Sequence, residues 1–504
     1  MPTLGFDNAL YLREQSEYIR ERAKLFQNKL YLEFGGKLVH DHHAARILPG
    51  FHPTAKIELL ERLKDQAEIL ICVYAGDIER RKTRADFGIT YDLDVLRLID
   101  DMRRREILVR GVVVTRYDRQ PVVDTFIRRL EQHEIPVWRH RAIAGYPADV
   151  DRIVSDDGYG SNPYIPTERP IVVVTGPGPG SGKMATCLSQ VFHEHRRGIA
   201  AGYAKFETFP IWSLPLKHPV NIAYEAATAD LGDFNQVDPF HLEAYGQTSI
   251  NYNRDVEIFP VVRRILERIM GAERVYKSPT DMGVNRAGFA ICDDAVCRNA
   301  STQEVIRRFF RYQCEYKMGL TGKDTVDRVR IIMEELNCTE TGRPVVPPAR
   351  AAAETARAAG RGHAGICCGA AIQLDDGRIV TGKNSALLHA AASAVVNAIK
   401  TLAGIPDAIH LISGQVLESV GAMKTGILQG SEVSMNLEET LIALSVSAAA
   451  NPMAQAAIGR LQELRGCEMH LTHMPPPGDE AGLRKLGLNL TCDPNFSSKF
   501  LHAE

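Results

Sequence analysis

The chain has 504 residues, of which 45% are hydrophobic and 24% are charged, which is typical of a globular protein with about three domains. Lysine and arginine number 60 and aspartate and glutamate 62, so the net charge of −2 gives no reason to expect nucleic acid or a membrane surface as a partner. No apolar run approaches the roughly 18 residues that span a bilayer, and the first residues do not form a secretory signal. Ten dispersed cysteines favour reduced thiols, so we expect a cytoplasmic protein.

The first 140 residues alternate between helix and strand patterns. We expect a helix over residues 4–27, a strand over 30–34 and, after a histidine-rich loop, a helix over 56–64. Further strands are predicted over residues 68–76, 108–115 and 135–138, separated by helices over 91–105 and 122–133. Such alternation predicts a Rossmann-like, mostly parallel sheet covered by helices. His40, His42 and His43 could gather a metal, but solvated side chains are the alternative.

The stretch around which we organise the chain is residues 171–190, IVVVTGPGPGSGKMATCLSQ. A β-strand pattern runs into a glycine-rich turn and then a helix, which is a favourable place for a phosphate group. The turn resembles a P-loop, although Met184 stands where the hydroxyl residue that holds Mg²⁺ is expected. The alternative is a tight turn whose glycines only permit packing. The residues predicted to bind a phosphorylated ligand are Gly176, Gly178, Gly180, Ser181, Gly182, Lys183 and Thr186.

Residues 201–285 are polar, turn-rich and interspersed with aromatic side chains, a pattern that suggests a substrate cleft. Together with Lys183, the candidate catalytic residues are Lys205, Glu207 and Asp281. Residues 288–294, GFAICDD, could form a strand whose last aspartates hold Mg²⁺ through water, with Thr186 and Asp293 as candidate ligands. The alternative for the whole region is an irregular subdomain whose polar groups satisfy its own loops.

Helices are predicted over residues 304–319 and 324–338, and residues 341–365 are expected to be a linker with one short helix. After the linker, two apolar runs around Asp375, Asp376 and Gly377 predict a hairpin, followed by a helix over 387–404. This opening resembles the cytidine deaminase fold. The H-x-E and P-C-x-x-C motifs of zinc deaminases are missing, so deamination is not expected.

A possible metal site near the C-terminus comprises Cys467, His470 and His473. Their spacing would align them on a helix but not on a strand, and the pattern does not decide between the two. Structural residues are the default interpretation.

Long strings of the chain resemble one bacterial protein family of about this length, known as a domain of unknown function with an N-terminal and a smaller C-terminal part. The strings are residues 76–100, the loop GPGPGSGKMATCLSQ, residues 201–231 and SPTDMGVN at 278–285. The resemblance implies a cytoplasmic protein. Relatives are sometimes labelled ATP-dependent peptidases, but no H-E-x-x-H motif of a zinc peptidase is present.

These observations predict three parts: a Rossmann-like domain over residues 1–225, a helical and irregular subdomain over 226–345, and a deaminase-like α/β domain over 346–504. We expect the loop to bind a small phosphorylated ligand, such as ATP with Mg²⁺, either for phosphoryl transfer or hydrolysis. The alternative is a non-catalytic ligand-binding or scaffold protein whose C-terminal domain drives homo-oligomerisation.

Overall fold

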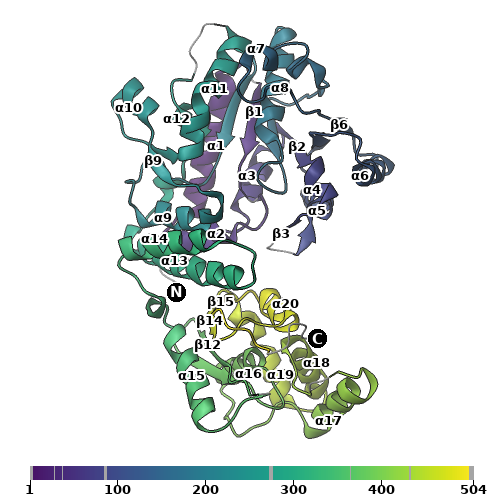
Figure 1. Cartoon of the computed structure of the whole chain (residues 1–504), viewed down its shortest axis with the longest axis vertical. Helices are drawn as coiled ribbons and strands as arrows, with labels where there is room; N and C mark the ends of the chain where they lie inside the picture. Colours follow the sequence, from purple (N-terminus) through teal and green to yellow (C-terminus); the bar gives the residue numbers. More distant parts are fainter. Residues whose placement is uncertain are drawn as a thin grey trace. The chain divides into compact units, whose positions relative to one another are not determined.

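The computed structural model divides the chain into two compact units, residues 3–301 (unit 1) and 302–504 (unit 2). The structure describes residues 4–27, 29–36, 38–84, 88–271, 276–363, 365–430 and 433–498. Each unit has its own sheet, drawn in Figure 1. The division into three domains stays a prediction.

The first half of unit 1 alternates strands and helices, as the sequence pattern indicates. Its elements are α1 (Asn8–Lys24), β1 (Leu30–Phe34), α2 (His42–Ile47), α3 (Ala55–Leu63), β2 (Ala67–Tyr74), α4 (Ala75–Glu79), β3 (Thr83–Arg84), β4 (Ile89–Thr90), α5 (Tyr91–Arg104), β5 (Val109–Thr115), α6 (Pro121–Gln132), β6 (Val137–Arg139) and α7 (Val150–Ile153). The helix α2 lies in the segment that the sequence predicts to be a histidine-rich loop.

The second half of unit 1 completes the large sheet and adds a small one. Its elements are β7 (Ile171–Thr175), α8 (Lys183–Arg196), β8 (Gly202–Phe206), α9 (Pro219–Ala227), β9 (Asn235–Val237), α10 (Pro239–Tyr245), β10 (Ile250–Tyr252), α11 (Asn253–Met270), α12 (Pro279–Met282), β11 (Gly283–Val284) and the first residues of α13 (Asp294–Lys317). β9 and β10 pair antiparallel.

The large sheet has seven strands in the order β11-β8-β1-β7-β2-β5-β6, and all neighbouring pairs are parallel. This confirms the predicted parallel α/β architecture; the narrower Rossmann-like description stays a prediction. From β2 the chain adds β5 and β6 on one side, then returns to β7 and adds β8 and β11 on the other. The direction of winding therefore changes between β2 and β7, which in open α/β sheets is where ligands bind.

Two expectations about local structure in unit 1 are wrong. Residues 202–206, assigned to an irregular cleft, form β8, because pairing with β1 and stacking of Phe34 on Phe206 bury a segment whose sequence is not strongly strand-like. Residues 288–294 do not form a strand: a 3-10 helix over Ala287–Ala290 leads into the start of α13.

Unit 2 contains a four-stranded mixed sheet in the order β13-β12-β14-β15. Its elements after α13 are α14 (Lys323–Glu335), α15 (Val346–Ala358), β12 (Gly369–Gln373), β13 (Ile379–Lys383), α16 (Ala390–Leu402), α17 (Gly414–Ala422), α18 (Leu437–Ala448), α19 (Pro452–Ile458), β14 (Glu468–Leu471), α20 (Pro477–Leu486) and β15 (Asn489–Cys492). The predicted hairpin is confirmed as β12 and β13, whereas the deaminase-like assignment stays a prediction.

The expected linker over residues 341–365 is instead part of the core of unit 2. The helix α15 buries Ala349 and Ala353 against β12, so closely that a side chain at Gly369 would meet the Ala349 carbonyl. Alanine-rich composition indicates close helix–sheet packing here rather than a flexible connection. Among the described residues, no helix is both long and apolar enough to cross a membrane.

Candidate functional site

The glycine-rich loop leaves β7 at the point where the winding of the sheet changes direction. A side chain at Gly178 would meet the Tyr91 hydroxyl at 2.3 Å, and one at Gly182 would meet Thr115 at 2.8 Å. Gly182 also has a left-handed backbone, with φ of 89°. The loop therefore lies directly against the ends of the neighbouring elements, and glycine at these positions permits that approach.

The start of α8 presents unused hydrogen-bond donors. Thr186 is the first residue of this stretch whose N–H is bonded inside the helix, to the Gly182 carbonyl at 3.0 Å. Within the described residues, no acceptor lies in hydrogen-bond range of the N–H groups of residues 182–185. Unpaired N–H groups and the positive end of the helix dipole favour an anion.

Two cations lie at the same loop. The ammonium of Lys183 folds back to the Gly178 carbonyl at 3.3 Å and the Ser181 hydroxyl at 3.5 Å. The guanidinium of Arg116, which follows β5, donates to the Gly180 carbonyl and lies 3.4 Å from the centre of the Tyr74 ring. No carboxylate among the described residues pairs with either cation, so the loop carries uncompensated positive charge.

The remaining residues of the predicted loop site lie below its surface. Gly176 follows β7 beside the Cys72 carbonyl, and Ser181 is buried with its carbonyl accepting from Thr115 at 2.8 Å. Thr186 is fully buried, and its hydroxyl accepts from the Cys72 thiol at 3.4 Å.

The structure does not bring the two candidate Mg²⁺ ligands together. Thr186 packs against Cys72, whereas the Asp293 carboxylate accepts from the Val296 N–H in the first turn of α13, and the Asp293 N–H donates to the Gly5 carbonyl. Asp293 therefore acts as a local cap. The part of the chain that the structure describes contains no group of three or more histidine, cysteine, aspartate or glutamate residues placed to hold a metal ion.

A second feature of unit 1 is a charged cluster on one face of β8. Tyr203, Lys205 and Glu207 alternate along the chain, so their side chains point to the same face. The Lys205 ammonium lies 2.6 Å from the Asp255 carboxylate on α11 and 3.0 Å from that of Glu207. On the adjacent strand β1, Glu33 accepts from the Tyr203 hydroxyl at 2.7 Å.

Burial changes the acidity of this cluster. Burial raises the pKa of Glu207 to about 7, although the Lys205 ammonium opposes the change. Burial alone would lower the pKa of Lys205, but the carboxylates of Asp255 and Glu207 raise it above its ordinary value. Glu207 can therefore exchange a proton near neutral pH while Lys205 stays charged.

A small cavity of about 30 Å³ adjoins the cluster. Lys205, Glu207 and Asp255 line it together with Trp212 and with Met184, from the first turn of α8. Met184 is the neighbour of Lys183 in the chain, so the helix that carries the unused N–H groups also forms a wall of this cavity. Lys205 and Glu207 thus line the cavity directly, and Lys183 stands one residue before Met184, which also lines it.

Asp281, the fourth candidate catalytic residue, has a local structural role. Its carboxylate accepts from the N–H groups of Lys277 at 2.8 Å and Ser278 at 3.1 Å, and from the Tyr245 hydroxyl. It forms a capping box with Ser278 at the start of α12. Pro279 and Met282 of the same helix line the cavity, but Asp281 does not.

The C-terminal cysteine and histidines have separate partners. His470 lies on β14, so the three residues are on a strand and the turns beside it. His470 bonds the Thr491 hydroxyl at 2.9 Å, His473 bonds that of Thr472 at 3.0 Å, and the Cys467 thiol points to Asp375. Their default interpretation as structural residues agrees with these contacts.

Sequence reasoning missed three residues that the structure brings to this region. Arg116 directly follows the predicted strand over residues 108–115, so its position at the carboxyl edge of the sheet could have been noticed. Glu33 and Asp255 carried no such signal, because only the pairing of β1 with β8 and the packing of α11 place them beside Lys205.

The chain is similar to known proteins over almost its whole length. The family described as "Domain of unknown function DUF1846, N-terminal" matches residues 4–337, and its C-terminal counterpart matches residues 341–502. A UPF0371 protein of Clostridium botulinum (strain Alaska E43 / Type E3) is 56% identical over 499 residues, covering 99% of both chains. One from strain Langeland / NCTC 10281 / Type F is 55% identical over 500 residues, again covering 99% of both. The resemblance inferred from the sequence is confirmed.

Proposed function

The chain belongs to the DUF1846 family, and we propose that unit 1 of this protein binds a small phosphorylated ligand at the loop of residues 176–183. One observation carries the proposal: the N–H groups of residues 182–185 and the cations of Lys183 and Arg116 converge on one loop without a carboxylate partner among the described residues. A phosphate would satisfy both the donors and the charge.

The rest of the ligand would extend along the carboxyl edge of the sheet. The strands β7, β1 and β8 are neighbours in that order, and adjacent strands are about 4.8 Å apart, so Glu207 lies roughly 10 Å along the edge from the loop. Between them Gly35 and Gly36 follow β1, and a side chain at Gly35 would overlap Glu207. This span suits a phosphorylated metabolite whose far end reaches the cavity beside Glu207.

Glu207 is the group in this region best suited to acid–base chemistry. Its pKa of about 7 permits both proton donation and proton acceptance at neutral pH, and the Lys205 ammonium, 3.0 Å away, holds it in place. We therefore favour a reaction in which Glu207 transfers a proton to or from the ligand. The arrangement includes no metal step, because Thr186 and Asp293 have separate partners.

A matched pair of glycine variants tests the binding proposal. Gly180 and Gly198 both have left-handed backbones, with φ of 74° and 77°, and a side chain at either would enter open space. Gly180→Asp and Gly198→Asp should therefore cost similar stability, about 1–2 kcal/mol. Only Gly180→Asp puts a carboxylate at the proposed phosphate position.

The measurement is a thermal-shift screen of the full chain with inorganic phosphate, pyrophosphate, nucleotides and sugar phosphates, with and without Mg²⁺. A ligand that binds the folded state raises the melting temperature. We expect at least one phosphate compound to stabilise the wild type and Gly198→Asp but not Gly180→Asp. Equal stabilisation of both variants, or none of the wild type, would exclude the loop as the site.

Glu207→Gln separates catalysis from binding once a ligand is found. If Glu207 transfers a proton, turnover should fall at least 100-fold while the thermal shift by the ligand persists. Undiminished turnover would remove Glu207 from the reaction. Binding without turnover in the wild type would favour the non-catalytic alternative.

A specific observation favours self-association as a second candidate function. Unit 2 exposes large apolar side chains to solvent: Ile427 is 75% exposed, Leu428 67% and Ile442 67%. Apolar residues can meet their own copies across a two-fold axis without repulsion. Sedimentation velocity tests this candidate: Ile442→Asp should reduce the molecular mass of an oligomer, and a wild-type monomer at micromolar concentration would exclude it.

A further inference from the structure

Unit 2 contains an open cavity of about 530 Å³ at the carboxyl ends of its two parallel strands. Thr472 and His473 follow β14, and the residues from Asp493 to Phe496 follow β15. The opposite wall is one side of α15, where Arg350, Glu354 and Arg357 are spaced by one helical turn or slightly less. A cavity of this size at the ends of parallel strands is suited to a small ligand.

One side of the cavity is rigidly held. The Arg350 guanidinium binds both oxygens of the Asp493 carboxylate, at 3.1 and 2.6 Å, and also Glu340 at 2.6 Å. Asp493 lies 3.4 Å from the buried ring of His470. Since two carboxylates satisfy Arg350, it braces α15 against β15 and is not available to a ligand.

The other cations of the cavity are available. Lys317, at the end of α13, is exposed, and no carboxylate among the described residues pairs with it. Arg357 pairs with Glu354 at 2.5 Å, but 63% and 67% of the two side chains are exposed to solvent. An exposed ion pair of this kind contributes little free energy, so Arg357 can exchange Glu354 for a ligand at small cost.

The cavity also offers polar and aromatic groups for the rest of a ligand. His473 and Asn495 line it, and the Asn495 amide is fixed by its bond to the Thr472 carbonyl at 3.0 Å. Phe496 lines the rim with 53% of its surface exposed. An exposed ring beside free cations is suited to a molecule with an anionic head and a flat or apolar body.

We propose that this cavity is a second binding site, for a small organic anion with a carboxylate or phosphate head. Lys317 and Arg357 bind the head, and Phe496 packs on the carbon skeleton. Of the three cations in the lining, Arg350 is satisfied by Asp493 and Glu340, Arg357 has only an exposed partner, and Lys317 has no carboxylate partner among the described residues. This site lies wholly in unit 2 and does not depend on the function proposed for unit 1.

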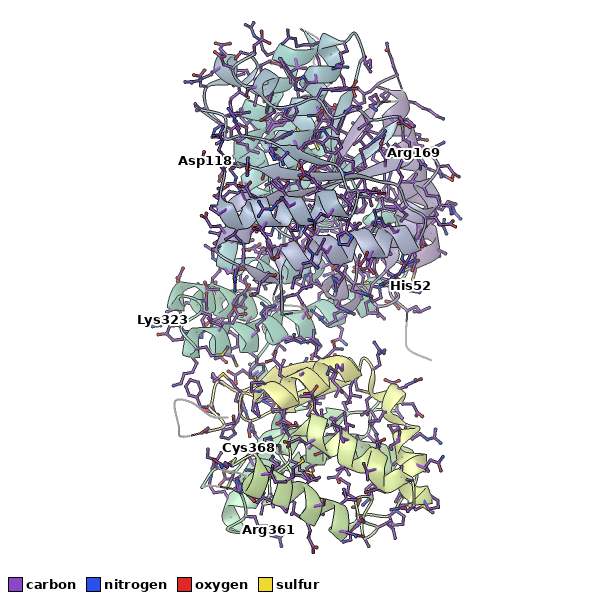
Figure 2. The ribbon with its side chains drawn as sticks, turned by 90° about the vertical axis from the view of Figure 1, so that its right-hand side faces the viewer. His52, Asp118, Arg169, Lys323, Arg361 and Cys368 are labelled. Atoms are coloured by element: carbon purple, nitrogen blue, oxygen red, sulfur yellow. The ribbon has the colours of Figure 1, made fainter. Side chains whose placement is uncertain are left out.

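The test is isothermal titration calorimetry on the full chain carrying Gly180→Asp, so that binding at the loop of unit 1 does not contribute. The probes are phenyl phosphate, benzoate and inorganic phosphate. The double variant Lys317→Gln/Arg357→Gln is compared with Lys323→Gln/Arg330→Gln. The control replaces Lys323, an exposed residue at the start of α14 (Figure 2), and Arg330. The partner of Arg330 is the exposed Asp327, three residues earlier, just as Glu354 lies three residues before Arg357.

We expect phenyl phosphate or benzoate to bind, with affinity at least 10-fold weaker in the double variant and unchanged in the control. The stronger of the two probes identifies the head as phosphate or carboxylate. Phe496→Ala should weaken the organic probe but not inorganic phosphate. Absence of binding by all three probes, or equal loss in the double variant and the control, would overturn the proposal. Equal melting temperatures of all variants would show that they fold.

Discussion

The cavities of the two units each lie between a strand and a helix but differ in how their charges are compensated. In unit 1, Lys205 is held between Asp255 and Glu207, with 19% of its side chain exposed. In unit 2, Lys317 is unpaired within the described chain and the Arg357–Glu354 pair is mostly exposed. Burial thus decides whether a cluster of charges is an internal part of the fold or a surface that can exchange partners.

The largest expected effect comes from removing the half-buried ammonium of Lys205 in unit 1. Lys205→Met leaves Glu33, Glu207 and Asp255 together without a cation, so it should lower the free energy of unfolding by about 3 kcal/mol. Urea unfolding followed by circular dichroism measures this change. The control is Lys64→Met, which removes an exposed pair with Glu106 and should change nothing measurable. If the two variants are equally stable, the ammonium of Lys205 does not stabilise the carboxylates around it.

The next effect concerns the loop. Gly182→Ala combines a left-handed backbone with a side chain 2.8 Å from Thr115, so it should lower the free energy of unfolding by about 3 kcal/mol. Gly198→Ala has similar backbone strain in open space and should cost about 1 kcal/mol. Urea titrations of the two variants would reveal whether contact with Thr115 matters; equal midpoints would argue against it.

A smaller effect is the pH dependence that Glu207 gives to unit 1. Because its pKa is raised to about 7 in the folded state from 4.5, the folded state binds this proton more tightly than the unfolded chain does. The free energy of unfolding should therefore fall by about 2–3 kcal/mol as the pH rises from about 4.5 to 7. Glu207→Gln should remove this slope, whereas the control Glu131→Gln, at an exposed pair with Arg139, should keep it. An unchanged slope in Glu207→Gln would contradict the raised pKa.

The smallest effect is expected in unit 2. Arg357→Ala and Lys317→Ala should each change the free energy of unfolding by less than about 0.5 kcal/mol, because neither side chain is engaged in a buried contact. Asp493→Asn, which breaks the brace to Arg350, should cost more than either. Guanidinium unfolding of the three variants measures the order. A large loss in Arg357→Ala would show that this arginine is structural.

Local sequence patterns predicted most of the large sheet. The strands β1 (LYLEF), β2 (AEILICVY), β5 (VRGVVVT) and β7 (IVVVT) are mostly apolar, and most of their residues are buried in the structure. The same reasoning failed for β8, whose glycine and lysine weaken the pattern, and for residues 288–294, whose apolar run is too short to distinguish a strand from a turn. Patterns of this kind report burial, and burial is decided partly by neighbours distant in the chain.

The candidate site was predictable only in part, for the same reason. Gly178, Gly182 and Lys183 stand in one local segment, where the turn between a strand and a helix is legible from the residues alone. Arg116, Glu33 and Asp255 come from distant segments, and their position beside this segment follows from strand order and helix packing. Asp281 looked catalytic because its neighbours are polar, but its carboxylate is used by a helix cap.

The amino-acid sequence by itself determined the family, through long matching strings of residues. It also determined the parallel α/β character of unit 1 and the place of the glycine-rich turn, because short-range backbone preferences and apolar periodicity set these two features. The tertiary structure alone decided which charges are compensated. Lys205 and Lys317 are the same residue type, yet one meets two half-buried carboxylates and the other meets solvent. That difference depends on the strand order and on α11, since electrostatic interactions depend on distance and burial in three dimensions.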